Sequence, residues 1–255
     1  MSGRGRDAES IVWGIHAVSG LVKRSPERVL EVSVSRERKD RRLDELIERV
    51  VNVGVAVNEL PRASLDKMAD DGAHQGVIAR CRPRPAANEN DLGELLDHIQ
   101  SPAFLLVLDG VQDPHNLGAC LRTADAVGVH AVIVPKDRAV GLTPVVRKTA
   151  SGAAETVPFI RVTNIARTLR QLKDRGIWIV GAAGQTGSSL LNTDLRGPLA
   201  IVMGSEGKGL RRLTRENCDL LADLPMQGEV ESLNVSVAAG VCLYLALGQR
   251  LASSD

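Results

Sequence analysis

Two polar segments in the last third of the chain carry residue types that can bind a ligand. Each follows an apolar run; the first is Gly204–Gly209 (Gly-Ser-Glu-Gly-Lys-Gly) and the second is Leu224–Asn234. Apolar runs that end in such turns are typical of strands whose loops meet around a ligand. The glycines permit close approach of the backbone to a ligand, and the carboxylate between them, that of Glu206, has no packing role. The two segments predict a binding site, with a surface hydrogen bond as the alternative for Glu206.

A third segment, Asn116–Gly128, carries two further candidates. Asn116 directly precedes a helix expected from Leu117, where asparagine is a favoured N-cap, and it can also bind a ligand. Arg122 lies on an expected helix whose other residues are mostly small and apolar, and an arginine in such surroundings needs an anionic partner. A phosphate or a ribose suits the planar guanidinium group of Arg122 as a binding partner. An ion pair with Asp125, three residues later on the helix, is the structural alternative.

Other common ligand-binding and nucleophilic motifs do not fit. The expected first strand after residue 100 ends in Leu-Asp-Gly-Val, which lacks the glycine fingerprint of dinucleotide-binding folds. Lys208 is followed by glycine and not by Ser or Thr, so the loop is not a Walker A motif. Ser232 has no histidine in its motif, and we do not expect it to act as a nucleophile.

Taken in their order along the chain, the three segments resemble the motifs of the SpoU/TrmH (SPOUT) family of RNA ribose 2'-O-methyltransferases, over roughly residues 104–250. The resemblance implies an α/β fold with a mostly parallel sheet and flanking helices, in which the C-terminal segment forms a deep trefoil knot. It also implies a homodimer formed through this domain. Knots are too rare for a sequence pattern alone to predict one.

The resemblance further implies methyl transfer from S-adenosylmethionine to an RNA ribose 2'-hydroxyl. The catalytic candidates that it gives are Asn116, Arg122, Glu206, Ser232 and Asn234. The cofactor-binding candidates are Gly204, Gly207, Leu224, Met226 and Leu233. Because the sulfonium carries an activated methyl group, catalysis amounts to in-line positioning and removal of the hydroxyl proton. A guanidinium is a poor base, so we expect Arg122 to bind the adjacent phosphate and orient the ribose.

The elements that must position these loops follow from the hydrophobic pattern after residue 100. Strands are expected at 104–108, 131–134, 156–160, 177–182, 199–203 and 220–224, and helices at 117–127, 143–150, 165–175 and 235–251. Apolar strands alternating with helices predict a parallel sheet covered on both faces, with the ligand beyond the carboxyl ends of the strands. The last helix is apolar almost all round and needs burial in a core or against a partner.

Residues 1–84 are expected to form a smaller α/β domain, with helices at 15–22, at 43–51 and after Pro61, and strands at 29–34, 53–57 and 76–80. Residues 85–100 contain four acidic residues and neither Lys nor Arg, which is typical of an interdomain linker. Residues 101–255 then form the catalytic domain.

The first domain is expected to bind the RNA substrate. Its sequence His74-Gln75-Gly76 is similar to a signature of the L30e-like RNA-binding domain that precedes the catalytic domain in this family. The substrate-binding candidates are Arg36, Arg38, Arg41, His74 and Gln75. Two structural alternatives stand beside this prediction, because a basic run is usually a solvated helix start and a lone histidine at a strand entry is usually structural.

Composition restricts the class of protein. The chain has 255 residues, 44% hydrophobic content and a net charge of +1, as expected of a soluble globular protein. Its four cysteines are spread singly, so we expect neither a metal site nor a disulfide framework. No uninterrupted apolar stretch is long enough to span a bilayer, which favours a cytoplasmic protein that does not bind membranes. With 2% aromatic residues, RNA must be held mainly by charge and hydrogen bonds.

The sequence therefore predicts an enzyme that methylates the 2'-hydroxyl of a guanosine in 23S ribosomal RNA, because its first domain resembles that branch of the family. A transfer-RNA ribose 2'-O-methyltransferase, which typically lacks this domain, is one alternative. A non-catalytic RNA-binding or ribosome-assembly protein of the same fold is another, disfavoured by the complete set of motif residues.

Overall fold

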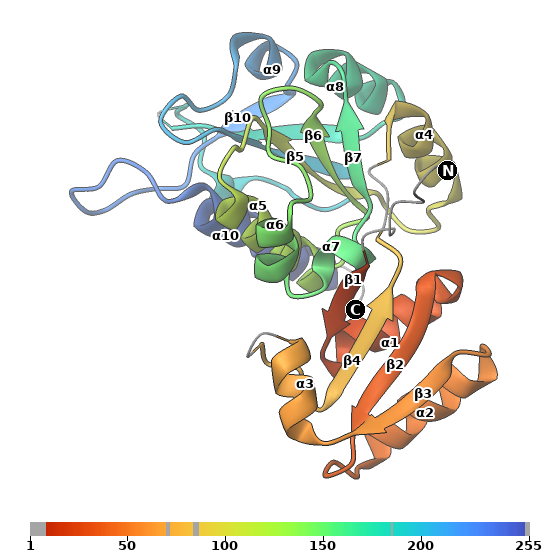
Figure 1. Cartoon of the computed structure of the whole chain (residues 1–255). Helices are drawn as coiled ribbons and strands as arrows, with labels where there is room; N and C mark the ends of the chain where they lie inside the picture. Colours follow the sequence, from red (N-terminus) through yellow and green to blue (C-terminus); the bar gives the residue numbers. More distant parts are fainter. Residues whose placement is uncertain (1–8, 70–71, 84–86, 185, 253–255) are drawn as a thin grey trace, which may run out of the picture. The chain divides into compact units, whose positions relative to one another are not determined.

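The computed structural model describes residues 9–69, 72–83, 87–184 and 186–252, and the chain forms two compact units (Figure 1). Unit 1 comprises Met1–Pro85 and Ser151–Thr156. Unit 2 comprises Ala86–Ala150 and Val157–Asp255. The path of the chain therefore enters unit 1 a second time, for a short segment in the middle of the sequence.

Unit 1 is built on a four-stranded sheet of order β1-β4-β2-β3. Only the β2–β3 pair is parallel. The strands are β1 (Ser10–Trp13), β2 (Val29–Ser35), β3 (Ala56–Leu60) and β4 (Val77–Cys81). The helices are α1 (Ile15–Arg24), η1 (Pro26–Arg28), α2 (Arg41–Asn52) and α3 (Arg62–Met68). The sequence predicted α1, α2 and α3 and three of these strands, with β3 placed three residues too early. It missed β1, whose four residues are too few to show a period.

The core of unit 1 forms where α1 and α2 bury their apolar faces. Helix α2 begins at an N-cap, Asp40, whose Oδ1 accepts hydrogen bonds from the backbone N–H groups of Arg42 (3.1 Å) and Leu43 (3.2 Å). Leu43, Leu46 and Val50 recur at helical spacing and are buried. The basic residues of the predicted RNA-binding run therefore lie before and at the start of a capped amphipathic helix.

The segment Ser151–Thr156 belongs to unit 1 and contains the one-turn helix α7 (Ala153–Thr156). Arg28 bonds to it twice, through an ion pair with the buried Glu155 carboxylate and a 3.1 Å hydrogen bond to the Glu155 carbonyl oxygen. Gly152 has φ = 93°, and a Cβ there would lie 3.0 Å from the Cβ of Ala17. The sequence pattern gave no sign of this packing, because the segment is too short and small to carry a period.

Unit 2 is built on a six-stranded, wholly parallel sheet of order β10-β8-β9-β5-β6-β7. Its strands are β5 (Phe104–Asp109), β6 (Ala131–Pro135), β7 (Phe159–Val162), β8 (Trp178–Ala182), β9 (Leu199–Gly204) and β10 (Leu220–Ala222). The central strands β5 and β9 are almost completely buried, as their continuous apolar sequences require. The predicted parallel sheet is confirmed, and the trefoil knot stays a prediction from the resemblance.

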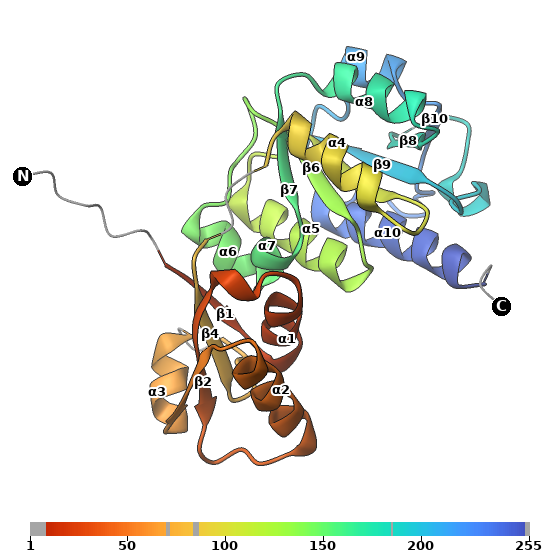
Figure 2. The same ribbon diagram turned by 90° about the vertical axis from the view of Figure 1, so that its right-hand side faces the viewer.

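Helices cover both faces of this sheet, with α5, α6 and α10 on one face and α4, α8 and α9 on the other (Figure 2). They are α4 (Glu89–His98), α5 (Pro114–Ala126), α6 (Pro144–Ala150), α8 (Ile165–Asp174), α9 (Arg212–Glu216) and α10 (Val235–Ala252), with a single 3-10 turn, η2 (Leu190–Asn192). Helix α5 packs against both α6 and α10. A Cβ on Gly118 would lie 2.5 Å from the Cβ of Thr149, so a glycine is needed where α5 and α6 meet.

The expected linker at 85–100 is wrong for most of its length, because residues 89–98 form helix α4 of unit 2. Asn88 and Asp91 form a capping box. Asn88 Oδ1 accepts a 2.8 Å hydrogen bond from the N–H of Asn90, and Asp91 Oδ2 accepts a 2.7 Å bond from the N–H of Asn88. Leu92 is buried in the core of the sheet's α4/α8 face. Three of the four acidic side chains that suggested a linker, those of Asp91, Glu94 and Asp97, lie on the exposed face of an amphipathic helix.

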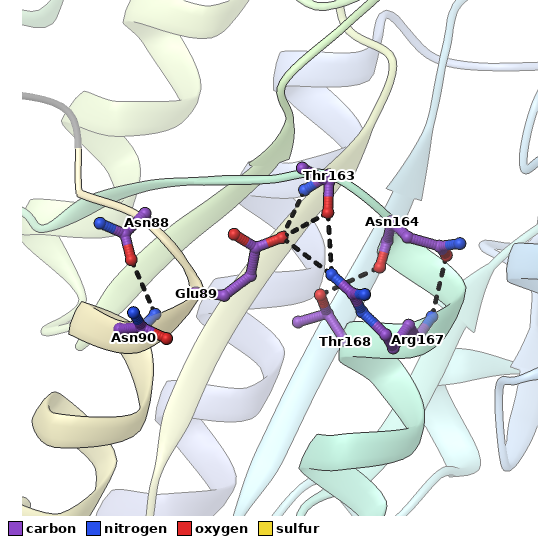
Figure 3. A network of polar contacts seen from close by, with 7 residues as sticks. All are labelled: Asn88, Glu89, Asn90, Thr163, Asn164, Arg167 and Thr168. Atoms are coloured by element: carbon purple, nitrogen blue, oxygen red, sulfur yellow. Dashed lines mark hydrogen bonds and ion pairs between the residues drawn. The ribbon is translucent and has the colours of Figure 1, made fainter.

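Helix α4 is also tied to the loop that precedes α8 (Figure 3). Glu89 Oε1 accepts 2.7 Å hydrogen bonds from both the backbone N–H and the hydroxyl of Thr163, and a 3.3 Å bond from Arg167. These bonds lower the pKa of Glu89, the Thr163 hydroxyl contributing most. These contacts attach the start of α4 to the rest of unit 2.

Helix α10 buries one face and exposes the other. Ala239, Cys242, Leu243 and Ala246 are buried, whereas the opposite side carries Val237, Val241, Tyr244 and Leu251 at exposures of 37–61%. In the described part of the chain it is also the helix long and apolar enough to cross a membrane by length and composition. Its packing on α5 and β9 instead makes it part of the unit 2 core. The predicted all-round burial is met on one side only.

Candidate active site

The candidate site lies at the carboxyl ends of the neighbouring strands β5 and β9, where Asp109 pairs with Gly204. Parallel strands place their following loops at one edge of the sheet, which is where open α/β sheets bind ligands. The loop after β9 and the segment between β10 and α10 contain the two polar segments, and helix α5 follows β5. The fold therefore brings the three predicted motifs to one edge.

The loop after β9 is a tight turn that requires glycine. Ser205 and Gly209 exchange backbone hydrogen bonds of 3.1 and 2.9 Å. Gly207 and Gly209 have φ values of 74° and 62°, in the left-handed region. A Cβ on Gly204 would lie 2.1 Å from the carbonyl carbon of Gly209, so any side chain there would force the turn apart.

An ion pair between the buried Asp109 and the partly exposed Arg211 fixes the end of this turn. The Asp109 side chain is fully buried at the end of β5 and accepts hydrogen bonds from Arg211 N (3.0 Å) and Nε (2.7 Å), with a further ion-pair contact from Nη2. A buried carboxylate needs such compensation for its lost hydration. This pair was not predicted, although an aspartate at the end of an apolar strand indicates a carboxylate that needs a partner.

Three side chains from the three motifs meet in one hydrogen-bonded cluster. Asn116 Nδ2 donates to Glu206 Oε1 at 2.8 Å. Asn234 Nδ2 donates to the same oxygen at 2.9 Å and to Asn116 Oδ1 at 3.0 Å. Two amides therefore orient one oxygen of the Glu206 carboxylate. The structure places these three catalytic candidates together; their roles stay predictions.

Asn234 also begins helix α10. Its Oδ1 accepts hydrogen bonds from the N–H of Ser236 (2.9 Å), the hydroxyl of Ser236 (2.7 Å) and the N–H of Val237 (3.4 Å). One side chain thus satisfies the exposed N–H groups of the helix through its oxygen and joins the cluster through its nitrogen.

The expected N-cap role of Asn116 is wrong. Helix α5 begins at Pro114, and Asp113 caps it by accepting a 2.8 Å hydrogen bond from the N–H of His115. Asn116 lies inside the first turn, is 7% exposed and points its amide at Glu206. Proline at the first position of a helix was the signal in the sequence for the true start.

A pocket of about 250 Å³ opens beside this cluster. Strand β9, the turn after it and the segment before α10 supply most of its wall. All five cofactor-binding candidates line it, and so do the catalytic candidates Glu206 and Ser232. Met203, Leu224 and Leu233 give the pocket apolar walls, whereas the glycine turn presents backbone groups. Such a combination suits a largely apolar ligand held through main-chain donors and acceptors.

A second pocket of about 380 Å³ adjoins the first. Ser205, Glu206 and Val235 line both cavities. The remaining lining residues of the second pocket are Gly110, Val111, Gln112, Asp113, Asn116 and Lys208. Glu206 therefore stands between two cavities of different character, the second of which has the more polar lining.

The structure does not bring Arg122 to this cluster within one chain. Its side chain is exposed, it lines neither pocket, and it makes no hydrogen bond or ion pair in the part of the chain that the structure describes. Arg122 follows Asn116 by six residues, which turns it about 240° away around a helix. The motif spacing that made both residues candidates also makes them face different directions.

In unit 1, His74 is a structural residue, and the prediction that it contacts RNA is wrong. It is 2% exposed, its Nε2 lies 2.7 Å from Asp66 Oδ1, and its Nδ1 accepts a 3.0 Å hydrogen bond from the N–H of Gly76. Both ring nitrogens are used inside the protein. Gln75 remains exposed at φ = 52°, and its Oε1 accepts a 3.4 Å bond from the N–H of Ile15.

The arginine candidates of unit 1 differ in availability. Arg38 is partly buried and bonds to Asp40 and to the carbonyl of Gln75. Arg36 is exposed, with one 3.2 Å bond to the carbonyl of Glu59. The Arg41 side chain is 92% exposed and pairs with Glu45 one turn along α2, an ion pair that costs little to break. Arg36 and Arg41 can therefore reach a phosphate, whereas Arg38 holds its own loop.

The cysteines show no sign of catalytic or metal chemistry. Burial raises the pKa of the thiols of Cys120, Cys218 and Cys242 to about 12, so they stay protonated at neutral pH. Among the residues that the structure describes, no three His, Cys, Asp or Glu side chains gather as a metal site would require.

Comparison with known proteins gives two family matches. The SpoU rRNA Methylase family matches residues 103–244, and the family of RNA 2'-O ribose methyltransferase substrate binding domains matches residues 11–87. These two ranges contain all the candidate residues of the site and of unit 1, respectively.

Individual relatives match nearly the whole chain. The 23S rRNA (guanosine-2'-O-)-methyltransferase RlmB of Haemophilus influenzae is 56% identical over 95% of this chain and 98% of its own. The protein of the same name from Escherichia coli is 54% identical over 94% and 98%. The structure of the SpoU methyltransferase AviRb from Streptomyces viridochromogenes in complex with AdoMet superposes with a TM-score of 0.69 over 98% of this chain and 95% of that one; at 23% identity it shows the shared fold.

Proposed function

Because this chain belongs to the SpoU rRNA Methylase family, we propose that it transfers the methyl group of S-adenosylmethionine to the 2'-hydroxyl of a guanosine in 23S ribosomal RNA. The strongest support is the hydrogen-bonded cluster of Asn116, Glu206 and Asn234, in which Glu206 lines a glycine-rich pocket. Relatives that carry this activity in their names match at 54–56% identity over almost the whole length of the chain.

The first pocket fits the cofactor. A Cβ on Gly207 or Gly209 would meet no atom within 4 Å, so the backbone of the turn is open to close approach by a ligand. Gly204, Gly207, Leu224, Met226 and Leu233 would hold the adenosine part. When bound, the cofactor supplies a methyl group already activated by a sulfonium. The protein must then align the acceptor oxygen with that methyl and remove its proton.

Glu206 is suited to orient the acceptor. Its Oε1 is fixed by two amides, whereas Oε2 has no hydrogen bond within the described residues. The residue also lines both pockets, so Oε2 can accept the hydrogen bond of a 2'-hydroxyl placed between them. That bond would turn an oxygen lone pair towards the methyl group. Asn116 and Asn234 hold the carboxylate, and Ser232, which also lines the first pocket, can bond to substrate or cofactor.

We further propose that the protein is a homodimer formed through unit 2. The exposed stripe on α10, made of Val237, Val241, Tyr244 and Leu251, is an apolar surface that a second copy would cover. Arg122 lies exposed on α5, which packs against α10. In a dimer built on this stripe, Arg122 of one chain would reach the site of the other and bind the phosphate next to the target ribose.

Unit 1 is the proposed RNA-binding domain, and the cytoplasm is the proposed location. The match of residues 11–87 to a substrate-binding family supports the assignment and favours a ribosomal over a transfer-RNA substrate, since transfer-RNA enzymes of this type typically lack the domain. Arg36, Arg41 and Gln75 are the exposed candidates for contact with RNA.

Mapping of ribose methylation in 23S rRNA tests the function directly. The map is compared between cells that lack the gene, cells with the gene restored and cells that carry the Asn234→Asp variant. One guanosine is expected to lose its methyl group without the gene and to regain it only with the wild-type protein. An unchanged map would refute the proposal, and a failure to bind S-adenosylmethionine at millimolar concentration in calorimetry would favour a non-catalytic RNA-binding protein.

A further inference from the structure

The second pocket has a position that the transfer reaction requires of an acceptor site. In an in-line transfer, the C–O bond forms on the side of the methyl group opposite to the breaking C–S bond, so donor and acceptor occupy adjoining cavities. The second pocket adjoins the first at Ser205, Glu206 and Val235.

The shared wall determines how a nucleoside would lie there. The 2'-hydroxyl must face the first pocket and therefore lies at Glu206. The base then extends towards the residues that only the second pocket contains. Among these, Gln112, Asp113 and Lys208 carry exposed polar side chains. Base identity is read by hydrogen bonds to base edges, so these three side chains are the candidates for recognition of the base.

Guanine is the natural base with two adjacent donors, N1–H and the N2 amino group, on its pairing edge. A carboxylate offers acceptors only and matches such a pair. Asp113 uses Oδ1 to cap α5, at 2.8 Å from the N–H of His115, and its Oδ2 has no hydrogen bond in the described part of the chain. The Lys208 ammonium and the Gln112 amide are the nearby donors for the guanine O6.

We propose that the second pocket binds the target guanosine and that Asp113 selects guanine by accepting hydrogen bonds from its N1–H and N2 amino groups. This inference rests on the proposed function. It gives Asp113 two tasks, since one carboxylate begins the helix that carries Asn116 and also reads the base. Adenine and the pyrimidines cannot offer this pair of donors, so they would leave the carboxylate without partners at a cost in free energy.

The test compares two RNA fragments that differ only at the methylated nucleotide, which carries either guanosine or inosine. Inosine lacks the N2 amino group and is otherwise the same base. The wild-type protein is expected to methylate guanosine with a kcat/KM about 10- to 100-fold above that for inosine, the effect of one hydrogen bond to a charged group.

Asp113→Asn is the informative variant. Asparagine caps helices as well as aspartate does, so the fold and α5 are kept, but an N–H₂ group replaces the oxygen that accepts from guanine. The variant is expected to lose most of its activity on guanosine RNA, to retain S-adenosylmethionine affinity in calorimetry, and to show a guanosine-to-inosine ratio near one. Asp174→Asn, an exposed carboxylate on α8 outside both pockets, is the matched control and should keep the wild-type ratio.

The outcomes separate the inference from the function on which it rests. A wild-type protein that methylates both RNAs equally, or an Asp113→Asn variant that keeps the wild-type preference, would overturn the assignment of Asp113 while leaving the methyl transfer intact. A wild-type protein that methylates neither RNA would overturn the proposed function, and this inference with it.

Discussion

Asn116 and Asn234 are 118 residues apart in the chain, yet their side-chain amides bond to each other at 3.0 Å and both donate to one oxygen of Glu206. A carboxylate that is held by two amides on one oxygen has a fixed plane, and its second oxygen has a fixed direction. The arrangement is therefore suited to orienting a neutral hydroxyl rather than to pairing with a mobile cation. Its disruption should affect the rate more than the binding of cofactor.

The Asn234→Asp variant tests this arrangement. Aspartate keeps the oxygen that caps α10 but removes the donated hydrogen bonds and sets a second negative charge beside Glu206. We expect kcat to fall by about 100-fold or more, as for the loss of a charge-assisted bond in a preorganised site, with a change in melting temperature of only a few degrees. Single-turnover kinetics with saturating cofactor measures the effect. An active variant would show that the cluster is structural.

Gly204→Ala tests the fit of the turn to the cofactor. The added Cβ would lie 2.1 Å from the backbone of Gly209, so the turn must open. We expect the affinity for S-adenosylmethionine to fall by more than 10-fold and the stability to fall by about 1–3 kcal/mol. Gly141→Ala is the control, because a Cβ there meets no atom within 4 Å and φ is not positive. Calorimetry measures cofactor binding by both variants, and thermal unfolding measures their stability. If Gly204→Ala binds the cofactor as well as the control does, the turn tolerates a side chain and the prediction is wrong.

The sheet and most helices of unit 2 could be predicted because the central strands β5 and β9 are almost continuously apolar and apolar strands alternate with helical segments along the chain. Helix α4 was not predicted, because its acidic side chains outweigh the buried Leu92 in a local average of hydropathy. Helix α5 starts three residues before the predicted Leu117, because Asp113 is the N-cap and Pro114 takes the first helical position. These errors are local, and the sequence held the information to avoid them.

Other features depend on tertiary structure and leave little trace in a local pattern. The partner of His74 is Asp66, from another element, so the histidine's burial could not be known from its neighbours in the chain. Arg211 pairs with Asp109 across 102 residues. Glu155 meets Arg28 through a segment whose composition is indistinguishable from a loop. In each case a charged group is satisfied by a partner that only the completed fold supplies.

His130 makes the stability of unit 2 depend on pH. Burial, with a smaller effect of Arg250, lowers the pKa of His130, and its Nδ1 accepts a 3.0 Å hydrogen bond from the N–H of Phe104. A lowered pKa means that the unfolded chain takes up the proton first. The stabilisation is therefore complete above the unfolded pKa of about 6.5 and is lost as pH falls through the lower folded value.

Chemical denaturation from pH 8 to pH 5 measures this effect. The free energy of unfolding of the wild-type protein should fall more steeply below pH 6.5 than that of His130→Asn, which has no proton to gain. The variant should also be less stable at pH 8, because the fit of the ring to the Phe104 N–H is lost. Parallel curves for the two proteins would show that His130 is not responsible.

Arg122 provides a test of the proposed dimer that a single variant cannot give. In its own chain the side chain is exposed and lines neither pocket. If it acts on the site of the second chain, Arg122→Ala and Asn234→Asp are each inactive alone, but a mixed dimer contains one site with both wild-type residues. When the two variants are mixed in equal amounts and their subunits exchange, about a quarter of all sites should contain both wild-type residues and be active. If Arg122 acts within its own chain, every site carries one lesion and mixing restores nothing. Arg122→Lys by itself, which keeps the charge but not the planar fork, should be as inactive as Arg122→Ala; activity of the unmixed lysine variant would show that charge alone suffices.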